Sequence, residues 1–528
     1  MKILVHKRAL VPVKVISFGG EEIQLDSSSC TAALWELAGR FPNELIGWCE
    51  ESFVEHLELE KWEEIFHHDL IMASYAVETT FLPERIGYVE QLPFANLNRE
   101  VLYGTWRMSR DVGGIQAKVL NRFKPLMGKI ENFEYLLNSV AKLGQQNSLF
   151  CYSAPGLVKH RHSENISYTA SKQQLFSFVY QHYNSVWLVV LIWCLYKYEN
   201  ELSLNSFLRG FKKQKYFQKK VDLSKITISP GTKLKLLNTI DVIIPTMGRP
   251  DHLYNVLKDL AEQTRLPEKV VIIEQNSNTA SISALDFLKN EQWPFEIIHH
   301  FIHQTGACNA RNIGLKEVAS EWVFFADDDI RIKPDTIDKA LQETRKYKID
   351  ALNMNCKQEG EKTVFDKVRQ WGSFGSGTSI VRASFAKNCS FSLIYEHGYG
   401  EDMDFGMQLR NLGCDIVYHP ELVLHHLKAS VGGFREKHAM EWEIGNPRPK
   451  PSPTIMAFAK KYFSSQQMLG YKMKMFLQNY RSQKEKNPFI YYSNMNKKWS
   501  SSEFWAEQLL RNEQRRASDN IEEFKSIN

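Results

Sequence analysis

The chain has 528 residues, of which 43% are hydrophobic and 24% are charged, and this composition excludes wholesale disorder. The length exceeds what one ordinary core needs and predicts two or three domains. The net charge of +5 is too mild to argue for nucleic acid as a partner, so we expect none.

The eight cysteines are scattered, and no two of them have CxxC spacing. A zinc cluster or a redox pair is therefore not expected. The N-terminal stretch MKILVHKRAL has basic residues but no apolar segment after them, so it does not resemble a signal peptide. Both observations favour a reducing, cytoplasmic location.

Residues 1–205 predict an α+β accessory domain. Residues 11–26 alternate as a β-hairpin that turns at Gly19–Gly20. Residues 59–77 and 171–203 have helical patterns. No catalytic motif is found here, and the histidines of KHRHS, His160 and His162, are typical of a solvated loop.

The most apolar stretch runs from Val186 to Tyr196, VWLVVLIWCLY. Eleven residues fall short of the roughly 20 that span a bilayer. We expect a buried helix.

Residues 206–237 predict a basic linker. Arg209 to Lys235 holds nine Lys and Arg against one Asp, a balance of +8. A solvated linker is one interpretation, and a surface that faces anionic lipid or an anionic polymer is the other.

The pattern changes at Ile240. Residues 240–246, 270–277 and 321–329 are short apolar strands with polar ends, and residues 251–264 have helical spacing. Strands alternating with helices predict an α/β fold with a mostly parallel sheet and helices on both faces. Ligands bind such sheets beyond the carboxyl ends of the strands, where the polar clusters lie.

Three consecutive aspartates, Asp327 to Asp329, end the strand FFADDD. Alternation along a strand places Asp327 and Asp329 on one face. Two carboxylates there suit a hard divalent cation such as Mg²⁺ or Mn²⁺. An acidic turn before the next helix is the structural alternative.

Two further clusters accompany the aspartates. In GACNARNIG, Arg311 lies near the start of a helix, where it can neutralise phosphate or contact a base edge. In GYGEDMDFGMQLR, Glu401 and Asp402 open another helix, and favourable helix-end charge alone would also explain them. His425 and His426 follow a short strand, and either could be a third metal ligand or a structural residue.

A Pro-rich break, NPRPKPSP, follows residue 445, and the predicted tail of residues 448–528 is a helical extension. We expect residues 454–486 to form helix that packs back on the preceding domain. An interfacial amphipathic helix is the alternative.

The motifs IIPTMGRP, IIEQNS, GACNARNIG, FFADDD, GSGTSIVR and GEDMDFGMQLR occur in this order between about residues 238 and 435. Together they resemble the inverting family 2 glycosyltransferases of GT-A fold. The resemblance implies a catalytic domain at 238–447, whereas residues 1–205 resemble no family that we recognise.

The resemblance implies roles for individual residues. Thr246 and Arg249 would lie near the nucleotide, and Arg311 would approach its base or phosphate. Glu274 stands where the family usually has an Asp that contacts the base, so the identity of the base stays open. The residues Asp327, Asp328, Gly375, Ser376 and Gly377 would complete the donor site.

The same resemblance assigns the chemistry. Asp402 corresponds to the catalytic base, with Glu401 beside it. Asp329 would be the main metal ligand, joined by Asp327 and by His426, which we favour over His425.

The implied function is metal-dependent inverting transfer, with Mn²⁺ or Mg²⁺, from a nucleotide sugar, preferably a UDP-sugar. The acceptor hydroxyl would belong to a glycan, a lipid-linked glycan or a peptide, as in polysaccharide biosynthesis. Any membrane contact would be peripheral, at the inner face. The alternatives are a nucleotidyltransferase and a non-catalytic binding protein with a degenerate GT-A domain.

Overall fold

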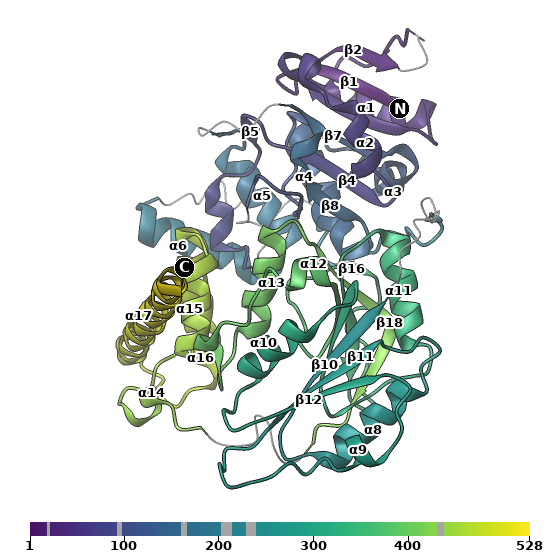
Figure 1. Cartoon of the computed structure of the whole chain (residues 1–528). Helices are drawn as coiled ribbons and strands as arrows, with labels where there is room; N and C mark the ends of the chain where they lie inside the picture. The colour runs from purple at the N-terminus through teal and green to yellow at the C-terminus, as the bar shows by residue number, and fades with distance from the viewer. Residues whose placement is uncertain are drawn as a thin grey trace.

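The computed structural model describes residues 1–17, 22–91, 98–159, 166–201, 214–228, 239–429 and 438–527. Figure 1 shows two large β-sheets, one built by the N-terminal part and one by the middle of the chain, with the C-terminal helices beside them. The predicted linker 206–237 is described only over residues 214–228.

The first sheet has seven strands in the order β2-β1-β3-β7-β4-β8-β6. The strands are β1 (Lys2–Lys7), β2 (Val11–Ser17), β3 (Leu45–Glu50), β4 (Ile71–Tyr75), β6 (Tyr103–Gly104), β7 (Val112–Gln116) and β8 (Phe150–Ser153). A separate pair joins β5 (Thr79–Thr80) to β9 (Ser167–Tyr168). Helices of this part are α1 (Cys30–Arg40), α2 (Leu59–Ile65), α3 (Ala117–Met127), α4 (Phe133–Gly144), α5 (Lys172–His182) and α6 (Val186–Glu199).

The structure confirms the α+β character of this part and changes two details. The hairpin is formed by β1 and β2 and turns at residues 8–10, whereas Gly19–Gly20 and His160–His162 lie outside the described residues. The helical prediction for 59–77 is wrong after Ile65, because residues 71–75 form the buried strand β4 between β7 and β8.

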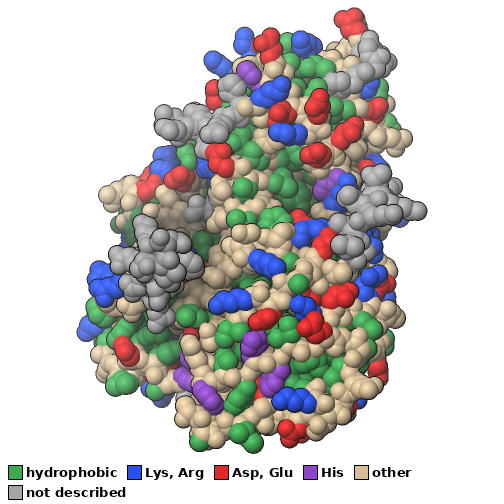
Figure 2. All heavy atoms as spheres, in the orientation of Figure 1, with side chains coloured by type: hydrophobic (Ala, Val, Ile, Leu, Met, Phe, Trp, Pro, Cys, Tyr) green, Lys and Arg blue, Asp and Glu red, His purple; other side chains and the backbone are tan. Residues whose placement is uncertain are grey.

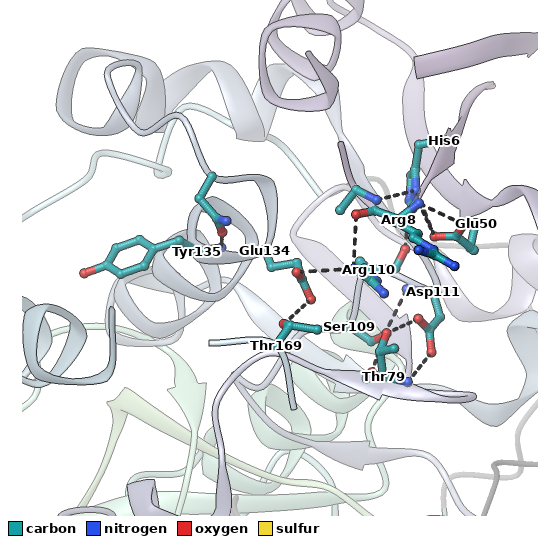
Figure 3. Close-up of polar contacts among 12 residues, drawn as sticks. His6, Arg8, Glu50, Thr79, Ser109, Arg110, Asp111, Glu134, Tyr135 and Thr169 are labelled. Atoms are coloured by element: carbon teal, nitrogen blue, oxygen red, sulfur yellow. Dashed lines mark hydrogen bonds and ion pairs between the residues drawn. The ribbon is translucent and has the colours of Figure 1, made fainter. Parts of the chain in front are cut away.

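A network of polar contacts lies inside this first part (Figure 3). Asp111, which is only 1% exposed, accepts hydrogen bonds from the backbone N–H groups of Glu78 and Thr79 and from the Thr79 hydroxyl. Arg110 lies 3.6 Å from Glu134, which also accepts from the Thr169 hydroxyl. Each buried carboxylate is therefore satisfied by neighbours from the same part of the chain.

The second sheet has nine strands in the order β12-β11-β10-β13-β17-β15-β18-β14, with β16 paired to β18. The strands are β10 (Ile240–Thr246), β11 (Lys269–Gln275), β12 (Glu296–Ile302), β13 (Trp322–Ala326), β14 (Ile330–Arg331), β15 (Ala351–Lys357), β16 (Arg369–Gln370), β17 (Thr378–Arg382) and β18 (Ile416–His426). The first four strands of the order are parallel, and β17 is antiparallel to both of its neighbours.

Helices on the faces of this sheet are α8 (Pro250–Ala261), α9 (Phe287–Asn290), α10 (Ala307–Glu317), α11 (Thr336–Tyr347), α12 (Ala383–Ala386) and α13 (Glu401–Asn411). The buried strand β10 follows from the apolar run IDVII, and α8 begins with a proline at its first position, where no hydrogen bond is lost. The predicted α/β class is confirmed. The carboxyl ends of β10, β11 and β13 meet at one edge of the sheet.

The N-terminal part contacts the second sheet at its opposite edge. Asp415, which precedes β18, accepts a hydrogen bond from Gln370 Nε2, and Gln370 Oε1 accepts from the Cys151 N–H. His67 Nε2 also lies 3.0 Å from the Tyr347 carbonyl. Because β13, β15 and β18 share one direction, these contacts lie at the amino ends of the strands, away from the polar clusters.

The C-terminal helices are α14 (Glu441–Ile444), α15 (Pro453–Tyr462), α16 (Ser465–Ser482) and α17 (Pro488–Ile527). They pack back on the protein as predicted: Met456, Phe458 and Phe476 share a core with Phe405 of α13. Lys461 and Tyr462 both donate to Asp404 Oδ1, at 2.9 and 2.8 Å. These contacts tie α15 to the first turn of α13.

Helix α6 departs from the expectation of a buried helix. Its inner side is buried, but Val186, Val189, Trp193 and Tyr196 are 48–54% exposed. Within the described part of the chain, none of the helices combines the length and apolar character needed to cross a membrane. Figure 2, in the same orientation as Figure 1, shows acidic and basic side chains interspersed over the visible face.

Candidate functional site

A cavity of about 500 Å³ opens at the carboxyl edge of the second sheet. It is lined by residues from the ends of β10, β11 and β13 and from the starts of α10 and α13, together with neighbouring loops. Of the residues predicted from the sequence, its wall contains Thr246, Arg249, Arg311, Asp327, Asp328, Asp329, Gly375, Ser376, Gly377, Glu401, Asp402 and His426.

The central aspartate is held by the first strand. Asp328 accepts hydrogen bonds from the Thr246 hydroxyl at 2.7 Å and from Arg249 Nη1 at 2.8 Å. Burial raises the pKa of Asp328, against the opposing charge of Arg249. Asp328 therefore joins the ends of β10 and β13 rather than facing solvent.

Asp329 is paired with His426 across a backbone ladder. Ile330 of β14 lies opposite His426 of β18, and this register places His426 Nε2 3.3 Å from Asp329 Oδ1. Burial opposes ionisation of Asp329, but hydrogen bonds from His426 and the Ala429 N–H, with the charge of Arg249, outweigh it and hold its pKa at about 2. Its hydrogen bond with Asp329 raises the pKa of His426.

Asp327 is the most accessible of the three, with a side chain that is 37% exposed. Arg311 Nη2 lies 3.1 Å from Asp327 Oδ1, and Arg311 Nε donates to the Ser376 carbonyl. A Cβ atom at Gly377 would lie 2.0 Å from Asp327 Oδ2, so only glycine allows this approach. The segment 375–377 thus forms a wall against which Asp327 lies.

Glu401 and Asp402 form the first turn of α13. The preceding Gly400 has φ of 121°, a backbone conformation that favours glycine, and it turns the chain into the cavity. Asp402 Oδ1 accepts from the Ser376 N–H at 3.1 Å. Burial, followed by the charge of Asp402, raises the pKa of Glu401 to about 7, and burial also raises the pKa of Asp402.

The donor set is compatible with a hard divalent cation. Asp329 and His426 present an oxygen and a nitrogen 3.3 Å apart at the cavity wall, and Asp327 lies on the same wall. Among the described residues, no group of three or more His, Cys, Asp and Glu side chains is close enough to hold a metal ion alone. Mg²⁺ and Mn²⁺ commonly use one or two protein ligands together with substrate phosphates and water.

Two predicted candidates lie off the cavity wall. Glu274 is engaged by Ser283, the Ala284 N–H and His299, and Gln275 lines the cavity in its place. Burial opposes the ionisation of Glu274, but these hydrogen bonds lower its pKa. His425 lies opposite Arg331 in the ladder and is not part of the wall.

The structure adds residues that the sequence patterns missed. Glu396 caps the start of α10, where its two oxygens accept from the Cys308 and Asn309 N–H groups at 3.0 and 2.9 Å. The rings of His397 and His438 stack with centroids 3.5 Å apart at the same wall. Only the position of Glu396 five residues before Glu401 could have suggested it, because its partners are more than 80 residues away in sequence.

Residues 241–394 match the family model described as glycosyl transferase family 2. Two curated relatives each match a little over 100 residues of this chain. An uncharacterized glycosyltransferase of Haemophilus influenzae is 26% identical over 103 residues, which are 20% of this chain and 33% of the relative. The uncharacterized glycosyltransferase YwdF of Bacillus subtilis is 27% identical over 105 residues, 20% of this chain and 37% of the relative. The match thus spans about a third of each relative's length.

Solved structures show weaker similarity. S. aureus TarS 1-349 in complex with UDP-GlcNAc has a TM-score of 0.34 and 17% identity, covering 48% of this chain and 75% of that one. The mannosyltransferase PcManGT from Pyrobaculum calidifontis, in complex with GDP-Man and Mn2+, has a TM-score of 0.30 and 14% identity, covering 56% and 84%. At these scores the likeness says nothing about substrate or mechanism.

Proposed function

We propose that this protein transfers a sugar from a nucleoside-diphosphate sugar to an acceptor hydroxyl group, because residues 241–394 match the model of glycosyl transferase family 2. The observation that carries the proposal is the single cavity that joins the aspartates after β13 to the Glu401–Asp402 pair. A transferase of this kind needs one carboxylate for a proton and other groups for the charge of the leaving nucleotide.

Asp402 would act as the general base. The Ser376 N–H fixes one carboxylate oxygen at 3.1 Å. The acceptor hydroxyl would give its proton to this carboxylate as its oxygen attacks the anomeric carbon and the bond to the diphosphate breaks. A single displacement of this kind inverts the anomeric configuration.

The charge that develops on the departing diphosphate needs cations nearby. Arg249 and Arg311 place fixed positive charges on the cavity wall, each already paired with an aspartate. Asp329 and His426 would hold Mn²⁺ or Mg²⁺, which supplies further positive charge to the diphosphate when bound. Thr246 and Arg249 would orient the nucleotide through the end of β10.

The proposal extends to a UDP-sugar as the preferred donor and to a glycan, a lipid-linked glycan or a peptide as the acceptor. Synthesis of a polysaccharide would fit these substrates. Of the nucleotide contacts expected from the sequence, Glu274 lies outside the cavity wall, so Gln275 is the better candidate from the end of β11.

Calorimetric titration tests the proposal directly. UDP and GDP would be titrated with and without Mn²⁺ into the wild-type protein and into Asp329→Ala. We expect Mn²⁺-dependent binding of one nucleotide, preferably UDP, and at least a tenfold loss in the variant.

Turnover of the matching nucleotide sugars would then be measured. Binding of a nucleotide with no turnover across a broad panel of sugars and acceptors would contradict catalysis and favour a binding protein. Release of inorganic diphosphate from a nucleoside triphosphate and a sugar 1-phosphate, without transfer from any nucleotide sugar, would favour a nucleotidyltransferase.

A further inference from the structure

The outward face of helix α6 is apolar along its whole length. Val186, Val189, Trp193 and Tyr196 recur at the spacing of one helix face, and each is about half exposed. A helix at a protein surface usually turns charged or polar residues outward. The exposed apolar face of α6 therefore indicates a surface that contacts an apolar partner.

A second helix extends this apolar face. Figure 1 shows α6 at the left edge of the molecule, and α6 packs against α16. Lys197, the residue after Tyr196, donates to the Tyr492 hydroxyl at 2.5 Å. Phe489, one turn before Tyr492 on the same face of α17, is 83% exposed. The contact between Lys197 and Tyr492 thus brings the start of α17, with its exposed aromatic side chains, next to the end of α6.

Lysines border this surface. Lys474 Nζ lies 5.1 Å from the ring of Trp187, and Lys215 Nζ lies 4.9 Å from the ring of Tyr180. In the described part of the chain, no carboxylate lies within ion-pair distance of Lys197, Lys215, Lys472 or Lys474. Two of the nearby acids are paired elsewhere, Glu199 with Arg85 and Glu201 with Arg85 and Lys172. The charge of a third, Glu503, acts on Lys472, which leaves these four lysines in excess. The border of the apolar face therefore carries excess positive charge.

We propose that the outward face of α6, with the start of α17, rests on the surface of a bilayer that contains anionic lipid. Valine and aromatic side chains would enter the boundary between headgroups and acyl chains, where Trp and Tyr are favoured. The lysines would reach the anionic headgroups while their aliphatic stems cover the apolar rings. The positive border favours this occupant over a neutral apolar protein surface.

Vesicle flotation tests the proposal with the full-length protein. The probes are vesicles of phosphatidylcholine alone and of phosphatidylcholine with about one third phosphatidylglycerol. We expect flotation with the anionic vesicles only, and less of it at high salt, because salt screens the lysines. Val189→Ser with Trp193→Ser should lower the partition coefficient at least tenfold. Lys197→Glu with Lys474→Glu should lower it to a similar extent.

Matched control variants distinguish binding through the α6 face from nonspecific binding to vesicles. Val364→Ser removes a valine, as Val189→Ser does, but from a loop of the second sheet where the side chain is 79% exposed. Lys387→Glu reverses the charge of an exposed lysine after α12. Both should float like the wild type, and all variants should keep the wild-type thermal midpoint. Absence of wild-type flotation, or equal flotation of the α6 variants, would overturn the proposal. A dimer in sedimentation velocity that Val189→Ser with Trp193→Ser abolishes, without flotation, would assign the face to a second copy of the chain.

Discussion

Both sheets of this protein bury carboxylates, but they use them differently. In the N-terminal part, Asp111 is 1% exposed and accepts a hydrogen bond from the Thr79 hydroxyl. Glu90 is 2% exposed and accepts from Lys142, Trp106 and Tyr183. In the second sheet, Asp327, Asp329 and Asp402 lie on the wall of a cavity of about 500 Å³. Burial raises the pKa of Asp111 in the first sheet and of Asp402 in the second, so a raised pKa does not distinguish the two regions. Access to a cavity separates the candidate catalytic carboxylates from the structural ones.

Replacing the candidate base should have the largest effect. Asp402→Asn keeps the hydrogen bond from Ser376 but cannot take a proton, so the rate of transfer should fall by about 10²–10⁴-fold. Nucleotide affinity measured by calorimetry should stay near the wild-type value. Near-normal turnover in this variant would show that another group is the base.

The matching change in the N-terminal network should affect stability and not chemistry. Lys142→Met leaves Glu90 buried without its cation, which typically costs about 3–5 kcal/mol of unfolding free energy. Urea denaturation measures this loss, and the kcat of the folded fraction should be unchanged. A change in kcat at equal folded fraction would mean that the two regions are coupled.

Two adjacent histidines sharpen the comparison within the second sheet. His426→Ala removes a candidate metal ligand and should weaken Mn²⁺-dependent nucleotide binding by about tenfold. His425→Ala is the control, because His425 does not line the cavity. Equal losses in both variants would argue for a general effect on β18, and no loss in either would remove His426 from the metal site.

The smallest effect concerns pH. The pKa of Glu401 is raised to about 7, by burial and then by the charge of Asp402, so the pair gives up its last proton near neutrality. Because the base must be ionised, kcat/KM should rise with pH through about 7. Glu401→Gln removes the neighbouring charge, so the rise should move to lower pH. A pH–rate profile from 5 to 9 checks the direction, and a shift to higher pH would contradict it.

The strands and helices around the cavity could be predicted because their signals are local. The apolar runs of β10, β11 and β13 and the helical spacing of α8 and α13 match the structure closely. Strand β4 departs from the predicted helix because Ile71–Tyr75 is a mostly apolar run without alternation. Its pairing with β7 and β8 depends on residues about 40 to 80 positions away.

The parts of the site that patterns could not supply depend on distant contacts. Glu396 reaches the start of α10, and Glu274 turns to His299 and Ser283 instead of the cavity. The apolar run of α6 indicated burial, but a sequence shows how apolar a helix is and not which of its faces is covered. The roles of Asp402 and Asp329 rest on resemblance together with their position at the cavity.

The link between Asp404 and helix α15 affects how this protein can be divided. Asp404 is fully buried two residues after Asp402, and it receives hydrogen bonds from Lys461 and Tyr462. A fragment that ends at residue 447 would keep every predicted catalytic motif, yet it would lose both donors and uncover the core around Phe405. Gene fusions or exchanges that move this catalytic unit between proteins would therefore need to carry the C-terminal helices with it.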